Sequence, residues 1–196
     1  MAELVEKEIA RHLLAPSGHP RVRAVNLKLV LRMGSVRPTS SFKVRRFALH
    51  DLDQIVALEK VCFPERPYTR DVFLLLFAQA GDGLLVAEDG GRVLGYAASM
   101  ADREEGLVVS IAVSPHSRRK GIGDALMESA LHHLVRCRRI WLLVSQRNVA
   151  AISLYRKHSF RETGQIVKGY YPNGDDAVEM SRLQIYPESQ RWSSKG

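Results

Sequence analysis

Residues 110–127 read SIAVSPHSRRKGIGDALM, an apolar strand pattern that passes through a basic, glycine-containing turn into a helix pattern. Three consecutive cations, residues 118–120, precede Gly121 and Gly123 where the helix is expected to begin. The first turn of a helix already carries partial positive charge, so further cations there are unfavourable unless an anion binds. Glycine lets a phosphate approach the backbone, and the free amide groups of the first turn bind anions. The stretch therefore predicts a polyphosphate site, although a solvated basic helix start would contain the same residues.

Two phosphate-binding motifs are absent from the sequence, and their absence argues against two classes of polyphosphate ligand. There is no G-x-x-x-x-G-K-[ST] loop for a nucleoside triphosphate. There is also no G-x-G-x-x-G, so a dinucleotide-binding fold is poorly supported.

The overall composition is that of one globular domain of 196 residues. The longest apolar run, Val72–Ala78, has seven residues, far below the ~20 of a membrane span. Three glutamates within the first eight residues and the absence of an apolar segment argue against a signal peptide. The two cysteines, Cys62 and Cys137, have no paired spacing, which favours buried thiols in a reducing cytoplasm over a disulfide or a zinc site.

The net charge of +8 is concentrated near the N-terminus. Residues 1–46 contain ten Lys and Arg against three Asp and Glu, a local excess of +7. A basic arm of this kind can bind RNA or another polyanion, and a solvated extension explains the same charge. Within it, residues 1–14 have a helix composition, residues 25–33 alternate as in a strand, and RPTSS at 37–41 is typical of a linker.

From residue 42 onward the hydrophobic periodicity is continuous and predicts strands and helices in alternation. The expected strands are Phe42–Phe47, Leu84–Glu88, Val93–Met100, Leu107–Val113, Ile140–Val144, Gln165–Tyr170 and Ala177–Leu183. The expected helices are Leu52–Val61, Arg70–Ala80, Val149–His158 and one after the basic turn with Ile122, Leu126, Ala130, Leu134 and Cys137 on one face. Asp51, with Gln54 three residues on, and Thr69 are the expected N-caps, and EDGGR predicts a tight hairpin. This order predicts an α/β or mixed α+β fold.

The basic turn in this context resembles the acetyl-coenzyme A site of the GNAT superfamily, whose signature is [QR]-x-x-G-x-[GA]. Residues 118–123 read RRKGIG, and an Asn, a Tyr and a Phe follow at the family spacing in NVAAISLYRKHSF, as Asn148, Tyr155 and Phe160. YYPNGDDAVEM (170–180) and CFPERPY (62–68) are similar to the hairpin and the substrate loop of protein N-terminal acetyltransferases, including the ribosomal-protein-alanine type and its archaeal relatives.

The resemblance covers residues 42–183 and implies a GNAT fold. It implies a mixed, mostly antiparallel sheet of about seven strands flanked by about four helices. The implied organisation is a basic N-terminal extension (1–41), the N-acetyltransferase domain (42–185) and a polar C-terminal tail (186–196).

The resemblance also implies acetyl-coenzyme A as co-substrate, with no metal. The implied cofactor-binding residues are Ile111, Ala112 and Val113 of the strand, Arg118, Arg119, Lys120, Gly121, Ile122, Gly123 and Asp124 of the turn, and Asn148 and Tyr155. Adjacent helical residues do not share a face, so His132 and His133 are expected to be surface or packing residues and not metal ligands.

The implied catalytic residues are Tyr155, as general acid, and Glu65. The catalytic role of Tyr155 is favoured over that of a core aromatic, whereas for Glu65 a solvated loop charge is the alternative. The resemblance places Glu65 at the first residue of the peptide, and Tyr68, Tyr170 and Tyr171 along its backbone, although these tyrosines could be ordinary packing.

The sequence departs from the family at three positions where relatives carry ionisable groups, two of them acid–base positions. The pattern L-[EH]-V-R-x-S-N is here LLVSQRN, with Leu143 and Ser145, and Leu107 stands where some relatives have His or Tyr. Neither leucine can accept a proton, so the general base is open and Glu65 acting through water is the remaining candidate.

The sequence therefore predicts an acetyl-coenzyme A-dependent N-acetyltransferase of protein α-amino groups. A lysine or small-amine acetyltransferase is the alternative within the enzyme class. A weakly catalytic GNAT-fold protein docked on RNA or the ribosome is the alternative from another class. We expect a cytoplasmic monomer or homodimer without membrane contact. The preferred first residue of the substrate, the oligomeric state and the role of residues 1–41 stay open.

Overall fold

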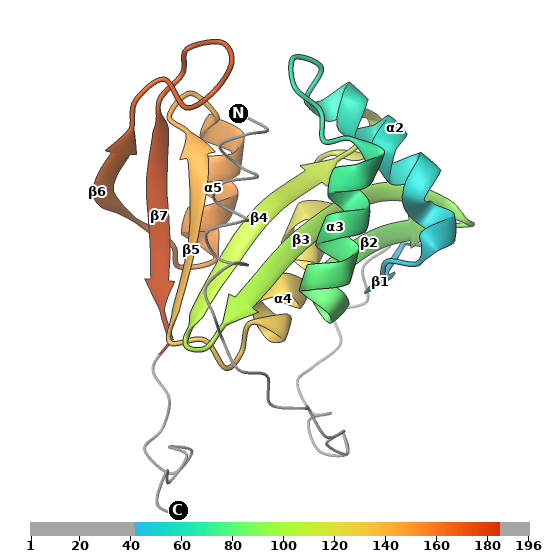
Figure 1. Cartoon of the computed structure of the whole chain (residues 1–196), viewed down its shortest axis with the longest axis horizontal. Coiled ribbons are helices and arrows are strands. Elements are labelled where there is room, and N and C mark those ends of the chain that lie inside the picture. The colour runs from blue at the N-terminus through green and yellow to red at the C-terminus, as the bar shows by residue number, and fades with distance from the viewer. Residues whose placement is uncertain (1–41, 185–196) are drawn as a thin grey trace, which may run out of the picture.

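The computed structural model describes residues 42–184, so the expectations for residues 1–41 and for the tail 186–196 lie outside the described residues. A seven-stranded sheet runs in the order β1-β2-β3-β4-β5-β7-β6 (Figure 1). Its strands are β1 (Lys43–Arg46), β2 (Leu84–Asp89), β3 (Arg92–Asp102), β4 (Glu105–Val113), β5 (Arg139–Ser145), β6 (Arg161–Val167) and β7 (Ala177–Leu183). The helices are α2 (Leu52–Cys62), α3 (Arg70–Ala80), α4 (Ile122–His133) and α5 (Val149–Lys157). No helix within 42–184 has the length and apolarity to cross a bilayer.

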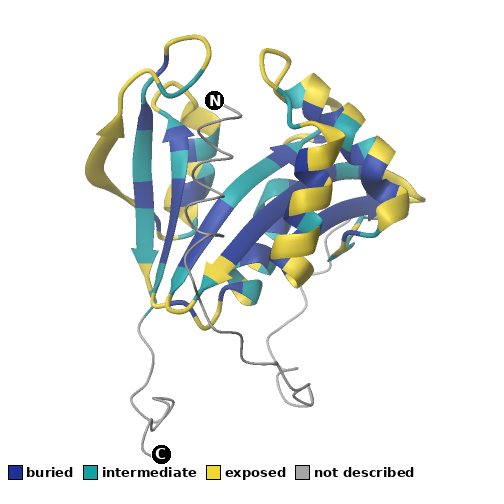
Figure 2. Ribbon diagram, viewed as in Figure 1, coloured by how far each residue is buried: buried dark blue, intermediate teal, exposed yellow. Residues whose placement is uncertain are grey.

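Two layers of helices cover opposite faces of the sheet, with α2 and α3 on one side and α4 on the other (Figure 1). In β2, Leu84 and Val86 belong to the core beneath α2 and α3, whereas Leu85 and Ala87 pack with Ile122 and other residues of α4. A strand covered on both faces is apolar at every position, which is why β2 begins LLVA. Figure 2 accordingly shows buried residues along the centre of the sheet.

The sheet divides between β4 and β5, and this division positions the site. These parallel strands pair only over residues 105–107 and 139–141. Beyond Leu107 the second edge of β4 pairs with no strand among residues 42–184, while its first edge stays paired with β3 up to Val113. The β3–β4 register shifts by one residue at Val109, a bulge that bends β4 away from β5.

Most predicted elements agree with the structure within two residues, and α3 and β7 agree at both ends. Thr69 caps α3 as expected, because its side chain accepts a hydrogen bond from the Val72 N–H. The expected hairpin between β2 and β3 is confirmed, with Gly90 (φ 56°) and Gly91 (φ 82°) in the left-handed region.

Two predicted elements were wrong at their ends. The last strand but one was expected at Gln165–Tyr170 but is β6, Arg161–Val167. All seven residues of β6 are exposed, so the apolar alternation that marks a strand in sequence is missing. Helix α4 ends at His133, before the predicted last turn, although Leu134 and Cys137 are buried as expected.

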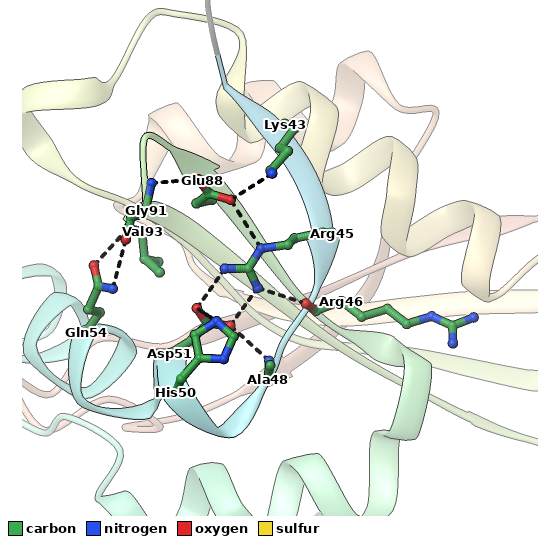
Figure 3. Close-up of polar contacts among 10 residues, drawn as sticks. All are labelled: Lys43, Arg45, Arg46, Ala48, His50, Asp51, Gln54, Glu88, Gly91 and Val93. Carbon is green, nitrogen blue, oxygen red and sulfur yellow. Dashed lines mark hydrogen bonds and ion pairs between the residues drawn. The ribbon is translucent and has the colours of Figure 1, made fainter.

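The predicted capping role of Asp51 and Gln54 was also wrong (Figure 3). Asp51 precedes α2, but its carboxylate makes no hydrogen bond to that helix. It accepts bonds from the Ala48 N–H (2.9 Å) and from both terminal nitrogens of Arg45 (2.7 and 2.8 Å). Gln54 instead bonds the backbone of the β2–β3 turn, at Gly91 and Val93. Both side chains therefore tie α2 to neighbouring segments instead of capping it.

Replacing Asp51 with asparagine is expected to cost about 2 kcal/mol of unfolding free energy, because it removes the charged partner of a buried ion pair. Burial raises the pKa of Asp51, but the hydrogen bonds from Arg45 and Ala48 outweigh this, so the pKa is lowered overall. A lowered folded-state pKa stabilises the protein above the unfolded-state value of about 3.9 and loses that contribution as the pH falls. Thermal melts at pH 7 and pH 3 should show a large difference between parent and variant at pH 7 and a small one at pH 3.

Candidate active site

A cavity of about 690 Å³ lies where β4 and β5 separate. Its walls come from four places in the chain: the end of α2 with the loop after it, β4, β5 with the start of α5, and the loop between β6 and β7. Of the predicted site residues, those lining the cavity are Glu65, Tyr68, Ile111, Asn148, Tyr155, Tyr170 and Tyr171. The division of the sheet therefore brings together side chains that are up to 106 residues apart.

The basic turn, residues 118–121, lies at the far end of β4 and is not part of the cavity wall. Arg119 (φ 61°) and Gly121 (φ 78°) have left-handed backbone conformations, and Gly121 occupies the N-cap of α4. The next residue, Ile122, is 1% exposed and anchors the helix start in the core. Successive amides in such a turn can converge on an anion, as the sequence predicts.

Gly123 fixes the spacing between this turn and the rest of the site. A Cβ atom at Gly123 would lie 3.5 Å from Leu154 of α5 and 3.8 Å from Val113 of β4. The start of α4 therefore lies beside the end of β4 and the middle of α5. Arg118 folds back onto the same strand, because its Nε donates to the Val113 carbonyl at 3.3 Å.

Residues 111–113 of β4, which the sequence predicts to bind the cofactor, offer backbone groups more than side chains to the site. Ala112 is 5% exposed and its side chain packs in the core under α2 and α3. On one edge, residues 111–113 pair with 95–97 of β3. Their other edge faces the division between β4 and β5, where an extended amide-containing chain can pair with it.

Asp124 faces α5. Its Oδ1 lies 2.7 Å from Lys157 Nζ and 3.1 Å from His158 Nε2. Burial raises the pKa of Asp124, but these two partners outweigh it and lower the pKa overall. The side chain therefore joins the start of α4 to the end of α5, and only its backbone is available to the turn.

Asn148 and Tyr155 belong to the first and last turns of α5. Asn148 is the N-cap, its Oδ1 accepting from the Ala151 N–H at 3.1 Å. Tyr155 is 7% exposed, packs against Phe160 and lines the cavity. Burial raises the pKa of its hydroxyl, which therefore stays protonated at any pH near neutrality.

The tyrosines predicted to hold a substrate lie on opposite walls. Tyr68 packs edge-on against Phe73 of α3, and burial raises its pKa. Tyr170 and Tyr171 contact each other edge-on, with ring centroids 5.0 Å apart, and burial likewise raises the pKa of Tyr171. Glu65, by contrast, is an exposed residue of the loop between α2 and α3.

The two acid–base positions where ionisable groups are missing lie in the same cavity. Leu107 is 8% exposed and Leu143 is half-buried, and both line the wall where β4 and β5 are still close. Ser145, which stands where the family pattern has Arg, donates a hydrogen bond to Asp175 Oδ2 at 2.9 Å. Asp175 is 6% exposed and also 3.0 Å from Arg147, so it holds the β6–β7 loop against β5.

Sequence reasoning missed Glu59, a carboxylate that lines the cavity with only 2% of its surface exposed. The sequence did contain a sign of it, because Glu59 falls on the buried stripe of α2 with Leu52, Ile55 and Leu58 at helical spacing. An acidic residue on such a stripe needs a partner or a function.

No group of His, Cys, Asp and Glu side chains within residues 42–184 is arranged to hold a metal ion. Of the paired histidines, His133 packs against β3: its Nδ1 lies 3.2 Å from the Ser99 hydroxyl, and burial lowers its pKa.

Comparison with known proteins identifies one family and several similar proteins. The acetyltransferase (GNAT) family profile matches residues 52–160. The N-alpha-acetyltransferase of Saccharolobus solfataricus is 31% identical over 156 residues, which span 72% of this chain and 92% of that protein. The structure of Ard1 from Thermoplasma volcanium superposes with a TM-score of 0.70 and 25% identity, covering 75% of this chain and 100% of that one. The ribosomal-protein-S18-alanine N-acetyltransferase of Escherichia coli gives a TM-score of 0.66 and 26% identity, covering 75% and 97%.

Proposed function

The chain belongs to the acetyltransferase (GNAT) family, and we propose from this premise that it is an acetyl-coenzyme A-dependent N-acetyltransferase of protein N-terminal α-amino groups. One observation carries the proposal. Strand β4 lines the cavity, leads into the basic turn, and between them has an edge that pairs with no other strand of the described residues. Relatives named for N-terminal acetylation support the substrate class.

The residues present fit the co-substrate. The turn at 118–123 would bind the pyrophosphate through backbone amides and cations, and the edge of 111–113 would pair with the pantetheine amides. Asn148 would hold the same arm from the start of α5. Bound there, acetyl-coenzyme A supplies an activated acetyl group as a thioester.

The peptide would enter the cavity from the opposite side. Tyr68, Tyr170 and Tyr171 would contact its backbone, and Glu65 would lie at its first residue. Glu65 is therefore the contact proposed for the charged α-amine, a role that suits an exposed loop carboxylate.

The α-amine is the acceptor that needs the least deprotonation. Its pKa is about 7.7–8.0, against about 10.4 for lysine, so at pH 7 roughly a tenth of α-amines are already neutral. A cavity whose two expected base positions are Leu107 and Leu143 suits this substrate better than a lysine. As the carbon–sulfur bond breaks, the Tyr155 hydroxyl would donate to the sulfur.

We expect the purified chain to acetylate the N-terminus of short peptides and to leave internal lysines unmodified. The measurement is thiol release from acetyl-coenzyme A with a panel of peptides, each tested with a free and with a blocked α-amine, and mass-spectrometric location of the acetyl group. Acetylation of blocked peptides at lysine would favour the alternative activity. Coenzyme A binding without turnover on any peptide would favour a weakly catalytic binding protein.

Contact with RNA or the ribosome through basic residues 1–46, the choice between monomer and homodimer, and a cytoplasmic location stay predictions.

A further inference from the structure

Glu59 is a buried carboxylate that has no cation partner among the residues that the structure describes. The other carboxylates with small exposed fractions in the described part of the chain each have one: Asp51 and Glu88 bind Arg45, and Asp175 binds Arg147. Within residues 42–184, no ion pair reaches Glu59. Burial of an unpaired carboxylate favours its neutral form, so an arrangement of this kind is costly unless it has a use.

The partners of Glu59 are a tyrosine hydroxyl and a backbone amide. Its Oε2 accepts from the Tyr96 hydroxyl at 2.5 Å, and its Oε1 from the Tyr68 N–H at 3.2 Å. Besides Tyr96 of β3 and Tyr68, the titratable group facing Glu59 is Cys62, one turn further along α2. Burial raises the pKa of Glu59 more than the two hydrogen bonds lower it.

A second hydrogen bond extends this contact to β4. The Tyr96 hydroxyl lies 2.8 Å from Ser110 Oγ, and Tyr96 itself is fully buried. Ser110 and Glu59 both line the cavity, on the strand and the helix that face each other across it. Ser110, Tyr96 and Glu59 thus form a continuous chain of groups that can pass a proton.

The other carboxylates of the cavity are less suited to accept a proton. Asp175 accepts from Ser145 and Asn173 and is paired with Arg147, so its charge is compensated. Glu65 is an exposed loop carboxylate that interacts with solvent. A good acceptor for an amine has a pKa near the working pH, a condition that a desolvated, unpaired carboxylate approaches.

We propose that Glu59 accepts the proton that the substrate α-ammonium loses before it attacks, either directly or through the hydroxyls of Ser110 and Tyr96. This inference rests on the proposed function and adds the proton acceptor that Leu107 and Leu143 do not supply.

Two protons leave the substrate nitrogen during the reaction. One proton passes from the ammonium to the Glu59 carboxylate, and the neutral nitrogen then forms a bond to the acetyl carbon. As the carbon–sulfur bond breaks, the second proton passes from the nitrogen to the departing sulfur, while the Tyr155 hydroxyl hydrogen-bonds that sulfur and keeps its own proton. Glu59 returns its proton to solvent before the next turnover.

The ionised form of Glu59 is the active one, so kcat should rise with pH through the raised pKa of Glu59 and then level off. Because the amine is bound at saturating peptide, this rise belongs to the complex and not to the free peptide. The nearby hydroxyls, with raised pKa values, contribute no change near neutrality.

The test is Glu59→Gln, which keeps the size of the side chain and the acceptor for the Tyr68 N–H. We expect kcat to fall by about 10²-fold at neutral pH, with unchanged coenzyme A affinity, and the rise of kcat with pH to move upward to the range in which the bound α-amine itself loses its proton. Tyr96→Phe should slow turnover as well, if the proton uses the hydroxyl chain. Glu88→Gln is the matched control, because Glu88 is a buried, hydrogen-bonded carboxylate outside the cavity, and it should keep the parent kcat.

A peptide carrying an N-terminal hydrazide nitrogen, which is uncharged at neutral pH, separates proton transfer from structural damage. Glu59→Gln should acetylate this probe at nearly the parental rate, whereas a distorted loop or helix would slow both substrates alike. Equal slowing of both substrates, or an unchanged pH profile, would overturn the inference, as would a pH rise that shifts in Glu65→Gln and stays in place in Glu59→Gln. A parent chain that acetylates no α-amine would instead overturn the proposed function, and this inference with it.

Discussion

Gly123→Asp is expected to abolish coenzyme A binding while leaving the fold intact. The new carboxylate would stand in the first turn of α4, where the pyrophosphate is proposed to bind. Two like charges about 4 Å apart at an effective dielectric constant of about 20 repel by about 4 kcal/mol, which corresponds to about a 10³-fold loss of affinity.

The stability of the same variant should change little or improve. A Cβ at Gly123 meets Leu154 and Val113 at ordinary van der Waals distances, so the side chain fits. An acidic residue in the first turn of a helix is also favourable, by about 0.3–1 kcal/mol. Binding and stability are thus expected to move in opposite directions, which a variant that merely misfolds cannot reproduce.

Calorimetric titration with coenzyme A and a thermal melt measure the two effects. Gly123→Asn is the matched control, since it adds the same volume without the charge and should lose far less affinity. An unchanged affinity in Gly123→Asp would place the pyrophosphate elsewhere on the protein.

The sequence was sufficient for elements whose pattern is local. Helix α3 has a capping Thr69 and an apolar stripe, and β7 follows the turn residues PNGDD, and both were located at both ends. Strand β6 was misplaced because its exposed residues carry no periodicity, and Gly164 (φ 87°) interrupts its pairing with β7. Asp51 was misread because its partner, Arg45, comes from a neighbouring strand that no local pattern identifies.

The candidate site also has one part that a local sequence pattern predicts and one part that depends on the tertiary structure. The basic turn is one continuous stretch of sequence, so its position before α4 could be predicted locally, and in the structure Gly121 is left-handed and Ile122 is buried. The cavity depends on how far β4 and β5 stay paired, which is a property of the bulge at Val109 and of the sheet order. Glu59 and Ser110 become neighbours of one cavity only through that geometry, so the proton acceptor could not be predicted from spacing.

Tyr155→Phe is expected to lower kcat by about 10²-fold and to leave the Michaelis constant for peptide nearly unchanged. The effect should lie at the low end for a general acid, because the raised pKa of Tyr155 is well above the ~8.5 of a thiol. The hydroxyl would then stabilise the departing sulfur mainly by hydrogen bonding, without complete proton transfer.

The substitution isolates the hydroxyl, because phenylalanine keeps the ring that packs against Phe160. The Tyr155 hydroxyl stays protonated across the pH range in which the enzyme can be assayed. Its removal should therefore lower kcat by the same factor at every pH, without changing the shape of the pH–rate profile. Glu59→Gln should instead shift the rise of kcat to higher pH, where the bound amine loses its proton unaided, so the two variants separate the group that donates to sulfur from the group that accepts from nitrogen. Steady-state kinetics from pH 6 to pH 9 on the parent and both variants would distinguish them. A Tyr155→Phe enzyme as fast as the parent would leave Tyr155 a packing residue of the core, with the sulfur departing as an unassisted thiolate.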